Sequence, residues 1–172
     1  VYSLAACLVI AVTAGYFFAG QQQPEGYRFK GASGINMYVK DNDGQHVQRE
    51  SNTYFPGEYI QIAYTQPEDC WFLLCSIDDS GRVTTYYPAE GDSLMHIEKG
   101  VSKALPNSIQ LDDYIGRELY VAVFARQSRS ASKVTAAITS ACNALDGLEQ
   151  CAQLQIENAE LHTLVITKKE RQ

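Results

Sequence analysis

The stretch CWFLLCSIDDSGRVTTYYP, residues 70–88, decides the fold class of this chain. Residues 70–77 are almost wholly apolar, which is typical of a central strand covered on both faces. The polar run 78–81 then turns the chain, and residues 82–87 are rich in β-branched and aromatic side chains. Pro88 ends this second run, because proline cannot donate a ladder hydrogen bond. The stretch therefore predicts a β-hairpin whose first strand lies inside a sheet.

Strand signals continue on both sides of this hairpin. Alternating apolar and polar residues, bounded by turn residues, predict further strands at 35–40, 45–49, 59–64, 108–111, 118–126 and 161–167. The polar turn 41–44 joins the first two of them. Short strands at this spacing predict a mainly β fold, an antiparallel sandwich or barrel, and of the two we expect the antiparallel β-sandwich.

One segment near the C-terminus has helical periodicity instead. Residues 132–147, SKVTAAITSACNALDG, place four apolar side chains on one stripe, namely Val134, Ile138, Ala141 and Leu145. Ser132 is the predicted N-cap, and Gly147 is the predicted stop. We expect this C-terminal amphipathic helix to pack against the sheet or to cap its end.

The start of the chain differs from the rest in charge. Residues 1–20, VYSLAACLVIAVTAGYFFAG, carry no charge, whereas all 14 Lys and Arg and all 20 Asp and Glu follow Gly20. As a helix this stretch spans roughly 30 Å, the thickness of the hydrocarbon core of a bilayer. The aromatic residues 16–18 suit a membrane interface. We therefore expect a transmembrane helix over 1–20, a short linker over 21–28 and an extracytoplasmic β-sandwich domain over 29–172.

Other interpretations of residues 1–20 stay open. A secretory signal peptide would be removed, although no basic residue precedes Leu4 here. The sequence Leu-Ala-Ala-Cys at 4–7 is similar to a lipoprotein processing box, but the apolar run continues after Cys7. The remaining alternative is a buried core helix.

The composition is acidic, with a net charge of -6 and a pI of about 5.0. Basic residues gather only near the C-terminus, at Lys168, Lys169 and Arg171. Because nucleic-acid binding depends on neutralising phosphates, this balance argues against DNA or RNA as a partner.

Three segments, in this order and spacing, resemble an uncharacterised family of bacterial β-sandwich domains. They are GINMYVKDNDG (34–44), FPGEYIQIAYTQPEDCWFLLCSIDDSGRVTTYYPAEG (55–91) and LDDYIGRELYVAVFARQ (111–127). The most specific element is the hairpin with Asp78, Gly81, Arg82, Val83, Tyr86, Tyr87 and Pro88. The resemblance covers about residues 29–168.

Members of this family often follow a single transmembrane helix in envelope proteins. Some carry an anti-sigma-factor zinc-binding segment at the N-terminus, and related domains accompany caspase-like peptidases. The resemblance thus implies a single-pass protein of the bacterial inner membrane, whose C-terminal domain lies in the periplasm and contacts an envelope protein or ligand. It implies no catalytic residues, because no active site is known for the family.

Cysteines other than Cys7 lie in the predicted domain. Cys70 and Cys75 lie about 16 Å apart on one extended strand and face opposite sides, so they cannot pair. Cys142, near the end of a helix, and Cys151, after a turn, can come close. In an oxidising compartment we expect a Cys142–Cys151 disulfide, and the alternative is a pair of buried free thiols.

Motifs for catalysis, metals and cofactors are missing from the sequence. His46, His96 and His162 are not paired at ligand spacing, and there is no Cys-x-x-Cys, Gly-x-Ser-x-Gly or Gly-rich phosphate loop. The run 41–44, Asp-Asn-Asp-Gly, is similar to a calcium loop, but His46 stands where such a loop requires Gly. We therefore expect no enzyme activity, no cofactor and no metal.

Three classes of function remain. The favoured one is a non-catalytic extracytoplasmic sensing or protein-binding domain, held to the membrane by one helix, in envelope regulation of the anti-sigma-factor type. The alternative is a structural module of an envelope complex, and the third class is an enzyme without a recognisable motif.

The longest predicted connection, residues 89–107, is the expected contact surface, because loops of a rigid sandwich usually carry recognition. It mixes apolar and charged residues and follows two tyrosines, and Met and Tyr are enriched at interfaces. The alternative is that Leu94 and Ile97 fold inward and cover the end of the sandwich. The expected contact residues are Arg82, Tyr86, Met95 and His96.

Overall fold

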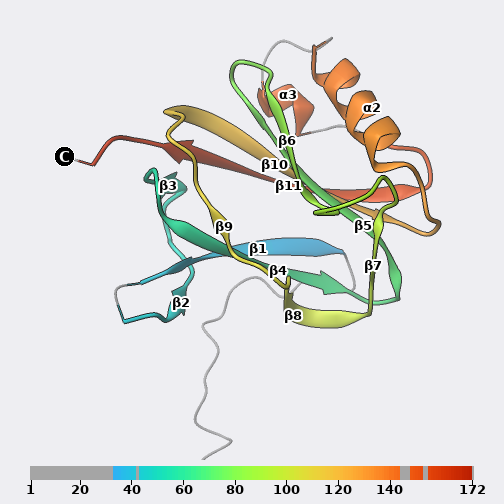
Figure 1. The fold of residues 1–172 in the computed structure, drawn as a ribbon, viewed down its shortest axis with the longest axis horizontal. Helices are drawn as coiled ribbons and strands as arrows, with labels where there is room; N and C mark the ends of the chain where they lie inside the picture. Colours follow the sequence, from blue (N-terminus) through green and yellow to red (C-terminus); the bar gives the residue numbers. More distant parts are fainter. Residues whose placement is uncertain (1–32, 42, 144–147, 153–154, 172) are drawn as a thin grey trace, which may run out of the picture. The chain divides into compact units, whose positions relative to one another are not determined.

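The hairpin of residues 70–88 forms two adjacent strands in the larger of two stacked sheets (Figure 1). The computed structural model describes residues 33–41, 43–143, 148–152 and 155–171. The larger sheet contains β3 (Thr53–Tyr54), β5 (Cys70–Asp78), β6 (Val83–Tyr87), β7 (Met95–Ile97), β10 (Gly116–Ala125) and β11 (Ala159–Lys168). The smaller sheet contains β1 (Gly34–Lys40), β2 (His46–Val47), β4 (Tyr59–Gln66), β8 (Gly100–Ala104) and β9 (Ile109–Gln110).

Strand order places β5 inside the larger sheet and β6 at its edge. The order is β3-β11-β10-β5-β6, and β7 pairs with the part of β5 that β6 leaves uncovered. In the smaller sheet the order is β2-β1-β4-β8, and β9 also pairs with β4. These pairs are antiparallel except for β3 with β11. The mainly β, antiparallel prediction is confirmed, with one parallel pair added.

Some strand boundaries differ from the prediction. The expected strand 45–49 is reduced to β2, and β3 was not predicted. The connection 89–107, expected to be a long loop, contains β7 and β8. Both strands are too short for their alternation to stand out in the sequence, and their pairing with β5 and β4 is what orders them.

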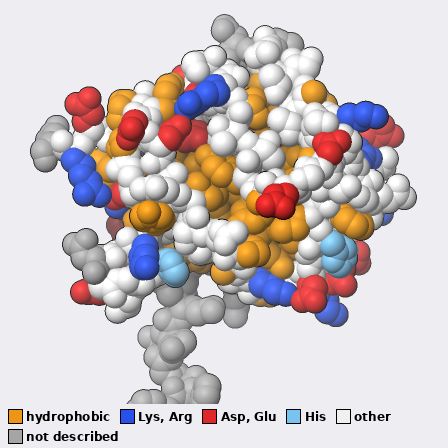
Figure 2. All heavy atoms as spheres, viewed as in Figure 1, with side chains coloured by type: hydrophobic (Ala, Val, Ile, Leu, Met, Phe, Trp, Pro, Cys, Tyr) orange, Lys and Arg blue, Asp and Glu red, His pale blue; other side chains and the backbone are white. Residues whose placement is uncertain are grey.

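The first hydrophobic core fills the space between the two sheets. The smaller sheet contributes Ile35, Met37, Val39, Ile60, Ile62 and Tyr64, and the larger sheet contributes Phe72, Leu74, Tyr120, Ala122, Phe124 and Ile166. Each set comes from alternate positions of its strands, because successive side chains of a strand point to opposite faces. Hydrophobic side chains are visible at the middle of one face of the molecule, with most charged side chains toward its rim (Figure 2).

A second core lies on the other face of the larger sheet, where α2 (Ala131–Asn143) and α3 (Leu148–Cys151) form a third layer (Figure 1). The sheet contributes Leu73, Cys75, Ile77, Leu119, Val121 and Val123, and the helices contribute Val134, Ile138, Cys142, Leu148 and Cys151. The prediction that the helix packs against the sheet is confirmed. This layer also explains why β5 is apolar on both faces.

The start of α2 corrects the predicted cap. Ser130, not Ser132, is the N-cap, because the Ser130 hydroxyl accepts a hydrogen bond from the backbone N–H of Lys133 at 3.2 Å. Ala141 is half-buried, and Leu145 and Gly147 fall outside the described residues. The buried side chains of α2 are Ala131, Val134, Ile138 and Cys142.

The membrane prediction concerns a part of the chain that the structure does not describe. Residues 1–20, the expected transmembrane helix, and residues 21–28, the expected linker, lie outside the described ranges. Within those ranges, no helix has both the length and the apolar character needed to cross a membrane.

Candidate functional site

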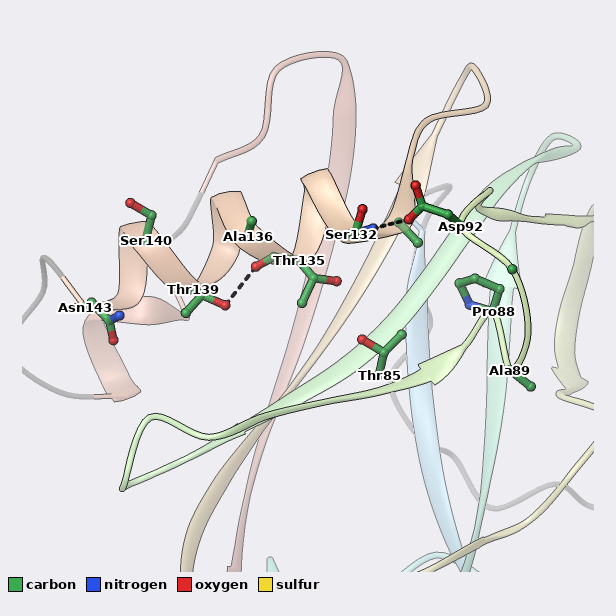
Figure 3. A pocket seen from close by; sticks show the side chains of 12 residues that line it. Thr85, Pro88, Ala89, Asp92, Ser132, Thr135, Ala136, Thr139, Ser140 and Asn143 are labelled. Atoms are coloured by element: carbon green, nitrogen blue, oxygen red, sulfur yellow. Dashed lines mark hydrogen bonds between the residues drawn. The ribbon is translucent and has the colours of Figure 1, made fainter.

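A groove of about 800 Å³ runs between α2 and the edge strand β6 (Figure 3). We call it the α2/β6 groove. One wall comes from α2, and the other comes from β6 and the segment that follows it. The lining residues are Thr85, Pro88, Ala89, Gly91, Asp92, Ala131, Ser132, Thr135, Ala136, Thr139, Ser140 and Asn143.

Small side chains make the helical wall of the groove. While one stripe of α2 packs on the sheet, the neighbouring stripe presents Thr135, Ala136, Thr139 and Ser140 to the groove. The Thr139 hydroxyl donates to the Thr135 carbonyl at 2.9 Å, which is a common way for a threonine to satisfy its hydroxyl within a helix. No long side chain of α2 therefore fills the space above β6.

One end of the groove is fixed by Asp92. Its carboxylate accepts hydrogen bonds from the Ser132 N–H and the Ser130 hydroxyl, both at 2.7 Å, and its backbone carbonyl accepts from the Ala131 N–H at 2.6 Å. The hydrogen bond from Ser130, followed by that from Ser132, lowers the pKa of Asp92. The charge of Asp92 thus serves the start of α2, and Asp92 is the only charged residue among the described residues that line the groove.

The strand wall has an open hydrogen-bonding edge. Apart from the ladder with β5, no backbone hydrogen bond joins residues 83–87 to another part of the described chain. An antiparallel edge strand directs alternate N–H and C=O groups away from its one neighbour. Thr85 pairs with Cys75, whose side chain lies on the helix-covered face, and points into the groove (Figure 3).

One hydroxyl in the groove wall lacks a hydrogen-bond partner. Thr135 Oγ1 is buried and has none among the described residues, although the backbone carbonyl of the same residue accepts from Thr139. Leaving a buried hydroxyl unpaired costs about 1 to 3 kcal/mol. An occupant of the groove that brings an acceptor would remove this cost.

The four predicted contact residues do not form one surface. Arg82 precedes β6 beside Asp78, whereas Met95 and His96 lie on β7 at the other end of β5. On β5, Ile77 pairs with Val83 at the start of β6, and Trp71 pairs with His96 on β7. These two positions are roughly 20 Å apart along β5. The structure therefore sets Arg82 apart from Met95 and His96, because β6 and β7 share one edge of β5 end to end, and contact of these residues with a partner stays a prediction.

Each of these residues has a structural role. Met95 packs on the core between the sheets, while His96 is exposed and makes an edge contact with Trp71 at 5.3 Å between ring centroids. Tyr86 stacks on Tyr120 with centroids 5.6 Å apart, and its hydroxyl lies 3.3 Å from the Ser76 hydroxyl. Leu94 and Ile97 are buried, as in the inward-folding alternative.

A network of charges closes one end of the sandwich. Lys168, only 2% exposed, lies 2.9 Å from Glu118 Oε2 and pairs with Asp112. Asp112 also pairs with Arg82 at 2.7 Å, and Arg82 pairs with Asp78 at 3.1 Å. This network joins the end of β11, the start of β10 and the β5–β6 turn. Lys168, one of the basic residues that gather near the C-terminus, is thus buried among carboxylates.

These carboxylates make the free energy of unfolding of the domain fall at low pH. Burial alone would raise the pKa of Asp78, but hydrogen bonds from Ser80 and Arg82 outweigh it and lower the pKa. Burial would likewise raise the pKa of Glu58 and of Asp112. The hydrogen bond from Arg49 outweighs it at Glu58, and the hydrogen bond from Lys168 outweighs it at Asp112, so both pKa values are lowered. A carboxyl whose pKa is lower in the folded state contributes stability that is complete above its unfolded pKa, about 4, and is lost below it.

We therefore expect the free energy of unfolding to fall slightly as the pH drops below about 6.5, where the unfolded chain protonates His162 more readily than the folded domain does, and to fall steeply below about pH 4, where the carboxyls are protonated. Asp78→Asn should start lower at neutral pH and fall less steeply in acid, because one of the responsible carboxyls is gone. Urea unfolding between these pH values measures both effects. The exposed Asp113→Asn serves as the control, and equal acid slopes for Asp78→Asn and the unmodified chain would contradict the assignment.

The four cysteines that the structure describes are free thiols. Cys142 and Cys151 are both buried in the core beneath the helices, and no disulfide joins them here. A disulfide between Cys142 and Cys151 in an oxidising compartment stays a prediction. Cys70 and Cys75 face opposite cores, as expected. Burial raises the pKa of Cys75 to about 12, which keeps it a neutral thiol and a poor nucleophile.

Within the described ranges, no three His, Cys, Asp or Glu side chains are grouped so as to hold a metal ion. Burial lowers the pKa of His162, which favours its neutral form at physiological pH.

Comparison with known proteins finds no protein family, no curated protein and no solved structure that matches this chain. Any functional conclusion therefore rests on the residues of the chain itself.

Proposed function

We propose that this chain is a non-catalytic protein-binding domain and that the α2/β6 groove is its binding site. The observation that carries the proposal is the open edge of β6 beside a helical wall of small side chains. Recognition of protein segments often uses such an edge, because main-chain hydrogen bonds give affinity and adjacent pockets give specificity.

The distribution of charge supports binding rather than catalysis at this groove. Asp92 already caps α2, and the other lining residues are hydroxyl, amide or apolar. General acid–base or nucleophilic chemistry needs a titratable group held beside its substrate. The hydroxyl groups of the walls can hydrogen-bond a polypeptide backbone, and the methyl groups can contact its apolar side chains.

We further propose that the domain lies in the periplasm, held to the bacterial inner membrane by residues 1–20, and senses or binds an envelope protein. The support is the uncharged stretch 1–20 and the resemblance of residues 29–168 to extracytoplasmic domains. Relative to the sequence prediction, the class of function is kept and the binding site moves from Met95 and His96 to the groove.

Photo-crosslinking in bacterial cells tests the proposal. A photoreactive phenylalanine derivative in place of Ala136, which is exposed and lines the groove, should give a crosslinked adduct with another protein. The matched control is the same substitution at Ala137, which is also exposed on α2 but lies on the other side of the helix and lines a separate pocket. Adducts of equal yield from both positions, or none from Ala136, would refute the groove as the binding site.

A further inference from the structure

We infer that the α2/β6 groove binds an extended, uncharged segment of a partner protein as an additional β-strand along β6. This inference rests on the proposed function and adds the mode of binding and the chemistry of the segment. The segment would pair with β6 through its backbone and direct alternate side chains toward α2.

The edge of β6 is open over residues 83–85, before a bulge between Thr85 and Tyr87 shifts its register against β5. Its sequence, VTTYY, is β-branched and aromatic throughout and contains no charge. Edge strands are normally protected from pairing by charged residues, by proline or by a covering element. Here Pro88 comes only after the last residue of β6, and α2 lies to one side with the groove between them. Such an edge is suited to accept another strand.

The helical wall defines the side chains that fit. An added strand would present every second residue to Thr135, Ala136 and Thr139, whose small side chains leave room for a branched aliphatic group. A charge at those positions would be buried without a partner, since the carboxylate of Asp92 is already hydrogen-bonded. The expected segment therefore alternates aliphatic residues, such as Val or Leu, with residues of any type.

The unpaired hydroxyl of Thr135 is an independent indication of an occupant. It belongs to the groove wall and has no hydrogen-bond partner within the part of the chain that the structure describes. Threonine in a helix has two accessible χ1 rotamers, so its hydroxyl can turn toward a carbonyl of the added strand. Binding would then supply the hydrogen bond that the free domain lacks.

Selection from a displayed library of random peptides of about eight residues, against the full chain in detergent, provides the probe. The selected peptides should share aliphatic residues at alternate positions and lack charge there. Methylation of the backbone nitrogens of one peptide, one at a time, should abolish binding at every second residue only, because alternate N–H groups face β6. Loss at every position or at none would contradict strand addition.

Variants of the groove then locate the peptide. Ala136→Trp should weaken binding by more than about tenfold, and Ala137→Trp should leave it within about twofold. Thr135→Val should weaken it roughly 3- to 10-fold, the value of one hydrogen bond, while the thermal midpoint stays equal or rises. A merely structural threonine would lower the midpoint instead. Unchanged binding in Ala136→Trp would overturn the inference.

Hydrogen exchange separates the failure of this inference from the failure of the proposed function. Bound peptide should increase the protection of residues 83–87. If crosslinking from Ala136 succeeds but these amides gain no protection, the groove binds a partner in another way and strand addition is wrong. If crosslinking from Ala136 fails as well, both proposals are wrong. A dimer formed through two β6 edges, seen by sedimentation, would also overturn the inference, because the occupant would be a second copy.

Discussion

A Lys168→Ala variant is expected to lose about 3 to 5 kcal/mol of its free energy of unfolding, because it leaves Glu118 buried beside an empty space. Glu118 is 5% exposed, and Lys168 is the cation that lies against it. At this size of domain the loss corresponds to a fall of roughly 10 to 20 °C in the thermal midpoint. Urea and thermal unfolding measure the effect.

The neighbouring Lys169→Ala is the control, because Lys169 is exposed and should change the free energy of unfolding by less than about 0.5 kcal/mol. A double variant, Lys168→Met with Glu118→Gln, should recover a large part of the loss, since neither side chain then carries a buried charge. If Lys168→Ala unfolds like Lys169→Ala, the buried network does not exist in solution.

Phe72→Ala should also lower the free energy of unfolding by about 3 to 5 kcal/mol, because it opens a cavity between the two sheets. Phe72 is fully buried on β5, and its ring lies 5.2 Å from that of Phe124 and 6.2 Å from that of Tyr64, measured between centroids. The contact with Tyr64 joins the larger sheet to the smaller one, whereas Phe124 lies on the neighbouring strand of the same sheet. Denaturant unfolding of the variant tests whether the sheets pack as described.

Val101→Ala provides the comparison for this cavity. Val101 lies on β8 with 83% of its surface exposed, so removing its methyl groups should leave the free energy of unfolding within about 0.5 kcal/mol. A loss below about 1 kcal/mol for Phe72→Ala would mean that the sheets do not share a core at β5.

Much of the fold could be predicted from local patterns. The hairpin of residues 70–88 could be predicted because its apolar run, its polar turn and the proline at its end all indicate the same structure. The helix emerged because its apolar positions recur with a period of about 3.6 residues. The sequence did not predict β3, β7 and β8, because these short runs show no clear alternation of their own and are ordered by pairing with β11, β5 and β4.

Properties that depend on long-range contacts could not be predicted from local sequence patterns. The burial of Lys168 has no signal in the sequence beside its basic neighbours Lys169 and Arg171, because it depends on the approach of Glu118 and Asp112. The separation of the expected contact residues also depends on long-range pairing, since the positions of β6 and β7 along β5 keep Arg82 away from His96.

The groove has a weak signal in the sequence that could have been used. Thr135, Ala136, Thr139 and Ser140 form a stripe of small residues beside the apolar stripe of the helix. Small residues on one side of a helix leave space when another element lies opposite. Which element lies opposite, the edge of β6, could be known only from the strand order.

The central claim is that a partner lies between α2 and β6, and one crosslinking measurement tests it most directly. The photoreactive residue stays at position 136 on α2, and tryptophan is introduced on the opposite wall at Thr85. The control places tryptophan at Thr84, which is also exposed on β6 but pairs with Ser76 and faces the other side of the sheet. We predict that Thr85→Trp removes the adduct and that Thr84→Trp preserves it. An adduct that persists in full with Thr85→Trp would show that the partner contacts α2 from outside the groove and would contradict the account.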